Sequence, residues 1–194
     1  MNCKRDVYQL NFKANFIKSV SVQKRVSAEK FVPSQVSLVE LDINNQNDIE
    51  ALGKTAVLWE RKASTFANYI YIDATKDKQY PDVEKEHYYA LTKQNENFEL
   101  LNPNSVLALA VYAEKKDPMN EIMWLQVDPK TNTKNASIFN REYKNIGTVI
   151  VDFLKSLSQK PLYVQSDTKA TPFYEKQGFE SMDLKHPDIM CWQG

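Results

Sequence analysis

The chain has 194 residues, enough for one domain with a sizeable core. Its 25 lysines and arginines balance its 25 aspartates and glutamates, so the composition gives no reason to expect nucleic acid or an anionic membrane as a partner. Cys3 and Cys191 are too few and too far apart for a disulfide framework or a metal site, and the N-terminus lacks the apolar run of a signal peptide or anchor. We therefore expect a cytoplasmic protein without a metal, either a monomer or a homodimer.

The first expected unit is an N-terminal arm, residues 1–35, rich in Lys, Ser, Asn and Gln. Its alternating run at 16–26 indicates an edge strand or hairpin arm, with a flexible leader as the alternative. Pro33 is expected to separate this arm from the main domain, 36–194, whose first strand is predicted at 36–43.

Two helices are expected next. Asn47 and Glu50 form a start similar to a capping box, and apolar residues follow at helical spacing, which predicts a helix over 48–61. The aromatic run 64–74 is helical by position, although its pattern also suits a strand. A polar loop at 77–85, a strand at 87–92 and a polar turn at 94–104 are predicted to follow.

Two buried strands are predicted in the middle of the chain. Residues 106–112 are all apolar, which is typical of a strand buried on both faces. In 121–127 the alternation predicts one face with Ile122, Trp124 and Gln126 and another with Met123, Leu125 and Val127. The short polar turn between these strands predicts an antiparallel hairpin, and a polar insert at 130–140 is expected at the rim.

The next expected helix has a glycine, Gly147, in its first turn. Apolar positions 146, 150, 153, 154 and 157 form one helical stripe, so the helix is expected to begin near Asn145. Gly147 lies in its first turn, where glycine costs up to ~1 kcal/mol relative to alanine. Two explanations stay open, namely close packing of another helix or close approach of a ligand to the backbone. A helix N-terminus favours a phosphate or pyrophosphate as that ligand.

The C-terminal segment predicts a strand, a helix and two further strands. Residues 162–165 form the strand, and Asp167 or Thr171 is expected to cap the helix that follows. Gly178 is placed where a helix ends in the left-handed conformation. The last strands are predicted at 179–184 and 188–192.

The segments YKNIGTVIVDFL and TPFYEKQGFE, with the strands before them, resemble the core of the GCN5-related N-acetyltransferase (GNAT) family. The acetyl-CoA loop of that family reads Arg/Gln-x-x-Gly-x-Gly/Ala, and a later signature is close to Asn-x-x-Ala-x-x-Phe-Tyr-x-x-x-Gly-Phe. Gly147 falls on the last glycine of the loop, and Asn145 replaces the first. Glu142 stands where Arg or Gln is expected, and Asp167 replaces the usual Asn. We expect Asn145 to keep the turn, because Asn tolerates left-handed backbone.

The resemblance, clear over 105–180, implies a mixed, mostly antiparallel twisted α/β sheet flanked by helices. It also implies transfer of an acyl group from acetyl-CoA to an amine on a small molecule or peptide. The main chain of Leu125, Gln126 and Val127 would pair with the pantetheine arm. The expected remaining cofactor contacts are Tyr143, Lys144, Asn145, Ile146, Gly147, Thr148 and Asp167.

Tyr174 matches the tyrosine that protonates the departing thiolate in many family members, and the alternative is a tyrosine that packs on its own helix. No general base is assigned, and the candidates are Glu60, Asp73, His87, Glu121 and His186. Motifs of phosphoryl transfer, dinucleotide binding and serine hydrolysis are absent from the sequence. The main alternative to an enzyme is a GNAT-fold module without turnover that binds CoA or a protein partner, because Glu142 and Asn145 depart from the family pattern.

Overall fold

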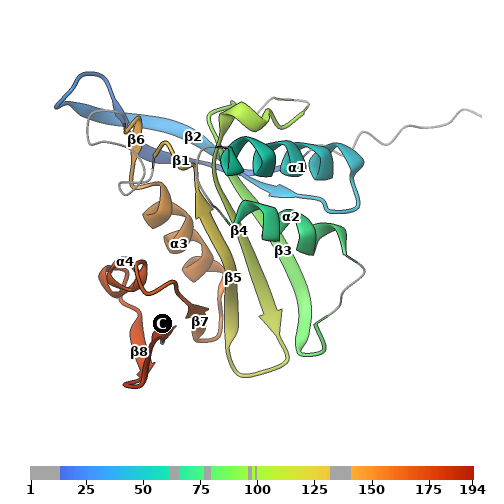
Figure 1. Ribbon diagram of the computed structural model, residues 1–194, viewed down its shortest axis with the longest axis vertical. Helices are drawn as coiled ribbons and strands as arrows, with labels where there is room; N and C mark the ends of the chain where they lie inside the picture. Colours follow the sequence, from blue (N-terminus) through green and yellow to red (C-terminus); the bar gives the residue numbers. More distant parts are fainter. Residues whose placement is uncertain (1–13, 62–65, 77–79, 96–97, 99, 132–140) are drawn as a thin grey trace, which may run out of the picture.

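The computed structural model describes residues 14–61, 66–76, 80–95, 98, 100–131 and 141–194. In these residues a nine-stranded sheet carries helices on both faces (Figure 1). The elements in chain order are β1 (Asn15–Arg25), β2 (Phe31–Leu41), α1 (Gln46–Glu60), α2 (Ala67–Thr75), β3 (Val83–Thr92), the 3₁₀ turn η1 (Pro103–Ser105), β4 (Val106–Lys115), β5 (Asn120–Val127), β6 (Tyr143–Lys144), α3 (Ile146–Leu157), β7 (Leu162–Gln165), α4 (Thr171–Lys176), β8 (Glu180–Asp183) and β9 (His186–Trp192).

The sheet order is β6-β1-β2-β3-β4-β5-β7-β9-β8. Only the β5–β7 pair is parallel among the described strands. The predicted fold class, a mixed and mostly antiparallel sheet flanked by helices, is therefore confirmed. The predicted series of strand, two helices, three strands, helix, strand and helix is present from β2 to α4, apart from the short β6 before α3.

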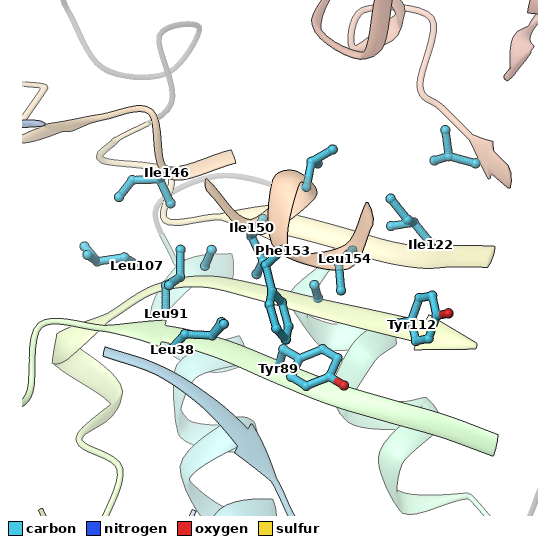
Figure 2. Close-up of a cluster of buried hydrophobic side chains, with 14 of the residues drawn as sticks. Leu38, Tyr89, Leu91, Leu107, Tyr112, Ile122, Ile146, Ile150, Phe153 and Leu154 are labelled. Atoms are coloured by element: carbon cyan, nitrogen blue, oxygen red, sulfur yellow. The ribbon is translucent and has the colours of Figure 1, made fainter. Parts of the chain in front are cut away.

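Each face of the sheet has its own core. Alternate residues of β3 go to opposite faces, so Tyr88 packs under α1 and α2 whereas Tyr89 packs under α3. Figure 2 shows the α3 side, where Phe153 points toward Tyr89, and the two ring centroids lie 5.0 Å apart, edge to face. The predicted α3 stripe is confirmed, with Leu157 alone of its five positions exposed at 38%.

Pro33 lies inside a strand, so the prediction that it separates the arm from the first strand is wrong. The 11-residue strand β1 pairs antiparallel with β2, and Pro33 in β2 lies opposite Gln23 in β1. β2 pairs with β3 only from Ser37 onward. The proline thus occupies a stretch with one free edge, where its missing N–H removes no ladder bond.

Other boundaries differ from the sequence prediction. The N-cap of α1 is Asn45, whose side chain accepts a hydrogen bond from Asn47 N–H at 2.9 Å, so the cap lies two residues before the predicted start. The ambiguous aromatic run is helical where it is described, as α2. The strand β3 begins at Val83 inside the predicted loop, and β9 begins at His186, inside the turn predicted between the last strands. Most of the predicted rim insert, 132–140, lies outside the described residues.

The predicted alternation of β5 is also wrong at its start. Ile122 packs in the α3 core, whereas Met123 and Trp124 both pack toward α1 and α2. The cause is a bulge, because the register with β4 shifts between Tyr112↔Ile122 and Val111↔Trp124. Both faces of this strand are apolar, so the sequence pattern does not reveal the extra residue.

Candidate functional site

The strands β5 and β7 separate after two residue pairs. Asn120 pairs with Leu162 and Glu121 with Tyr163, and no later residue of β5 pairs with β7 among the residues described. The bulge at Met123 follows immediately, and bulges bend a strand and increase its twist. One edge of β5 is therefore open from about residue 122 to its end at Val127.

The hydrogen-bond pattern of β5 shows which main-chain groups face this open edge. Asp128 N–H donates to Leu107 O at 2.8 Å, which makes these two residues a hydrogen-bonded pair with β4. Such pairs alternate along an antiparallel ladder, so Gln126 also directs its main chain toward β4. The amides and carbonyls of Leu125 and Val127 face the open edge. Of the three residues expected at the pantetheine arm, Leu125 directs its amide and carbonyl to this edge and Val127 its amide, while the Val127 carbonyl accepts a hydrogen bond from Gln126 Nε2 at 2.8 Å.

The turn before α3 has the expected left-handed residue. Asn145 has φ 65° and ψ 14° and is the N-cap, so the expectation that it keeps the turn is confirmed. The first i to i+4 bond runs from Val149 N–H to Asn145 O at 3.0 Å. The amides of Ile146, Gly147 and Thr148 therefore have no acceptor inside the helix. Amides of this kind, at the positive end of a helix dipole, favour an anion as their partner.

The loop before α3 is anchored to the N-terminal hairpin. β6 pairs with β1, and Arg25 N–H donates to Glu142 O at 2.8 Å. The Tyr143 side chain is buried in the α3 core, and burial, together with the charge of Glu142, raises its pKa. The Lys144 ammonium lies 3.8 Å from the centroid of the Phe31 ring. Tyr143 and Lys144 thus hold the loop in place, and the Glu142 side chain is exposed.

Gly147 contacts the next motif directly. A β-carbon on residue 147 would lie 3.1 Å from Cζ of Phe173 on α4, a tight contact that the Phe173 ring would have to shift to relieve. The packing explanation for this glycine therefore has a contact that supports it. The same position lies between the amides of Ile146 and Thr148, where a ligand at the start of α3 would approach the main chain.

The helix α4 is capped differently from the prediction. Its N-cap is Ala170, whose side chain makes no capping hydrogen bond. The prediction that Asp167 or Thr171 caps this helix is therefore wrong. Asp167 instead closes the turn before the helix, since its Oδ1 accepts from Lys169 N–H at 2.8 Å and its carbonyl from Ala170 N–H at 2.6 Å. The exposed Asp167 side chain therefore stabilises the turn that precedes α4.

The end of α4 confirms the prediction for Gly178, which has φ 79°. Gly178 N–H donates to Glu175 O at 2.9 Å and Phe179 N–H to Tyr174 O at 3.1 Å. These two bonds define a Schellman motif, which requires a left-handed residue after the helix. The motif fixes the chain direction between Tyr174 and Phe179.

Tyr174 is buried, with 5% of its surface exposed. Its ring lies edge to face between Phe173 at 5.1 Å and Phe179 at 5.4 Å. Burial raises the pKa of the phenol above its usual value, so it stays protonated at neutral pH. The hydroxyl has no hydrogen-bond partner within the described part of the chain. The ring packs in the core, as expected for a structural tyrosine, and carries a protonated, unpartnered hydroxyl.

Of the five candidate bases, Glu121 and Asp73 lie beside β5. Glu121 belongs to β5 itself, at the last residue pair before the strands part, and its Oε2 lies 3.0 Å from the Lys115 ammonium. Asp73 Oδ2 accepts a hydrogen bond from Trp124 Nε1 at 2.7 Å. Both carboxylates are therefore near the opening, on the face covered by α1 and α2.

The other three candidates lie elsewhere. His87 is held between Glu40 at 2.6 Å and Glu114 at 3.1 Å, on strands β2 to β4. Glu60 is exposed at the end of α1, and His186 is exposed at the start of β9. The structure does not bring these residues to the open edge of β5.

The described residues contain no group of three or more His, Cys, Asp or Glu side chains arranged to hold a metal ion. Among the helices described, none has the length and apolar character needed to cross a membrane. Sequence reasoning did not identify the support that Arg25 gives the loop, because pairing between segments more than 100 residues apart leaves no local pattern.

No family model matches the sequence, and no curated protein sequence matches it. Among solved structures, the chain is similar to Tetrahymena GCN5, with 13% identity over 77% of this chain and 90% of that one and a TM-score of 0.46. It is also similar to a protein from Lactobacillus plantarum proposed to be an N-acetyltransferase, with 10% identity, coverage of 80% and 94%, and a TM-score of 0.46. At these values neither likeness carries an argument about function, which must come from the residues of this chain.

Proposed function

We propose that the chain is an N-acyltransferase of the GNAT type that transfers the acetyl group of acetyl-CoA to an amine. The observation that supports this most strongly is that Leu125 and Val127, at the open edge of β5, pack against the same core as Ile146, at the start of α3. An elongated cofactor with amide groups at one end and phosphates at the other matches these two features. We also expect the protein to act in the cytoplasm.

The cofactor would bind mainly through the main chain. The pantetheine amides pair with Leu125 and Val127 as an added strand would, and the pyrophosphate accepts from the amides of Ile146, Gly147 and Thr148. Such contacts depend on backbone shape, so the replacement of the family's first loop glycine by Asn145 leaves them intact. The exposed Glu142 side chain contributes repulsion only if it turns toward the phosphates.

The reaction joins the amine nitrogen to the thioester carbonyl carbon and breaks the carbon–sulfur bond. The amine proton passes to a carboxylate, and we assign this role to Glu121, because it is the only one of the five candidates on β5 and lies where the strands part. The departing sulfur takes the phenolic proton of Tyr174. Because burial makes the phenolate costly, this proton is expected to move together with carbon–sulfur cleavage rather than before it.

Release of free CoA thiol from acetyl-CoA in the presence of a panel of primary amines tests the proposal. We expect at least one amine to give acetylated product, and Glu121→Gln to lower kcat roughly 10²- to 10⁴-fold without weakening acetyl-CoA binding. Saturable binding of acetyl-CoA with no transfer to any amine would favour the alternative, a binding module without turnover.

A further inference from the structure

Three aromatic side chains, Phe66, Tyr69 and Trp124, form a partly exposed surface that we call the aromatic shelf. The Tyr69 and Trp124 rings are stacked at 9° with centroids 5.5 Å apart, and the Phe66 centroid lies 5.6 Å from that of Trp124. Tyr69 is 53% exposed and Phe66 is 40% exposed. Adjoining exposed aromatic rings of this kind are typical of a surface that a ligand covers.

The shelf is fixed to β5 at the open edge. Phe66 N–H donates to Gln126 Oε1 at 3.1 Å, and Trp124 Nε1 donates to Asp73 Oδ2 at 2.7 Å. These two bonds tie α2 and the residue before it to the positions on either side of Leu125, whose main chain faces the opening. The shelf therefore lies beside the opening on the face covered by α1 and α2, opposite α3.

Carboxylates gather around Asp73, at one side of the shelf. Asp73 is next to the shelf, and Asp73, Glu86 and Glu121 all act on Tyr80, whose hydroxyl lies 3.5 Å from Asp73 Oδ1. Desolvation and then these carboxylates raise the pKa of Tyr80. The nearby cation Lys115 is engaged by Asp82 at 2.7 Å and Glu121 at 3.0 Å. A cation that reaches the shelf thus meets ring faces together with negative charge.

We propose that the aromatic shelf and Asp73 bind an ammonium group of the acceptor, so that the acceptor is a diamine with a second amine available for acylation. This inference rests on the proposed transferase function and adds the class of acceptor to it. A split between two strands opens toward both faces of the sheet, so a donor held at α3 and an acceptor held on the shelf approach the same edge of β5. The ammonium on the shelf stays charged beside Asp73, while the other amine loses its proton and attacks.

Calorimetric titration of the full chain with 1,5-diaminopentane and with 1,5-pentanediol tests the shelf without any need for turnover. The two probes have the same length, and only the first is charged. We expect the diamine to bind at least about tenfold more tightly than the diol. Asp73→Asn keeps an oxygen acceptor for Trp124 Nε1 while removing the charge, and it should weaken diamine binding about tenfold.

The control is Asp152→Asn, which removes one carboxylate on the exposed side of α3 and should leave diamine affinity unchanged. If Asp73→Asn does not fold, Tyr69→Leu removes an exposed ring and should give the same loss. Equal affinity for diamine and diol, or no effect of either shelf variant, would overturn the inference. Acetyl-CoA titrated into the same proteins separates the two claims, because absence of acetyl-CoA binding refutes the transferase while the diamine result still reports on the shelf.

Discussion

Gly147 and Phe173 are packed so closely that a methyl group on residue 147 would lie 3.1 Å from the Phe173 ring. One residue belongs to the loop and helix start that resemble the acetyl-CoA loop, and the other to the later tyrosine signature. This contact holds α4 against the N-terminal turn of α3. It therefore couples the position proposed for the pyrophosphate to the position of Tyr174, which is the next residue of α4.

The first prediction uses this contact to separate packing from ligand binding. Gly147→Ala gains up to ~1 kcal/mol of helix propensity. It loses about 1–3 kcal/mol to overpacking, so a net destabilisation is expected. In a Phe173→Leu background the clash is removed, and the same substitution should become stabilising. Urea unfolding of the four proteins measures both values. The same effect in both backgrounds would mean that Phe173 does not restrict residue 147.

The second prediction concerns the left-handed turn at Asn145. Asn145→Ala should destabilise the protein by roughly 1–2 kcal/mol, because alanine adopts φ 65° at a cost that asparagine partly avoids. Asn145→Gly should be within about 0.5 kcal/mol of wild type, since glycine adopts this conformation freely. Urea unfolding distinguishes them, and alanine and glycine variants of equal stability would contradict the account of this turn.

The third prediction tests Tyr174 as the acid for the leaving thiolate. Tyr174→Phe keeps the ring between Phe173 and Phe179 and removes a hydroxyl without a partner in the described residues, so stability should change little. Acyl transfer should slow roughly 10²- to 10⁴-fold in single turnovers at saturating acetyl-CoA. Tyr89→Phe, a second buried tyrosine of the same core, is the control and should transfer at the wild-type rate. Equal rates for all three proteins would make Tyr174 a packing residue.

The fourth prediction follows from the raised pKa of Tyr174. Burial makes the folded state hold the phenolic proton more tightly than the unfolded chain does. Its contribution to stability is therefore constant below the ordinary value of 10.0 and is lost as the pH rises above it. Wild type should lose stability faster than Tyr174→Phe between about pH 10 and 11, by up to about 1.4 kcal/mol per pH unit. Parallel curves in urea unfolding at these pH values would show that the phenol is not buried.

Local signals made parts of the fold predictable. The α3 stripe, the left-handed Asn145 and the Schellman glycine Gly178 each depend on a few adjacent residues, and the structure has all three. The bulge at Met123 was not predictable, because β5 is apolar on both faces and an extra residue leaves no mark in such a pattern. The prediction that Pro33 precedes the first strand was wrong for a related reason. Only the pairing of β2 with β3, which begins at Ser37, shows that β2 has a free edge at Pro33.

The candidate site also combines features that local sequence predicts with features that it does not predict. The loop and helix start around Gly147 follow from a short motif, whereas its support by β1 depends on pairing between Lys24 and Tyr143. The aromatic shelf joins α2 to β5, and Tyr69 and Trp124 are too far apart in sequence for any periodic signal. Main-chain directions at Leu125 and Val127 likewise require the register with β4. These features are set by tertiary pairing, which local sequence does not encode.

Calorimetric titration of the full chain with acetyl-CoA tests the central claim most directly. The account predicts saturable binding at one site in the wild-type protein. It also predicts that Gly147→Glu in the Phe173→Leu background, where residue 147 has room for a side chain, loses this binding because a carboxylate then lies beside the amides at the start of α3, while the circular dichroism spectrum stays nearly unchanged. Absence of binding to wild type at about 1 mM acetyl-CoA, a concentration at which even weak complexes near −4.1 kcal/mol form, would contradict the claim that the split between β5 and β7 holds a CoA thioester.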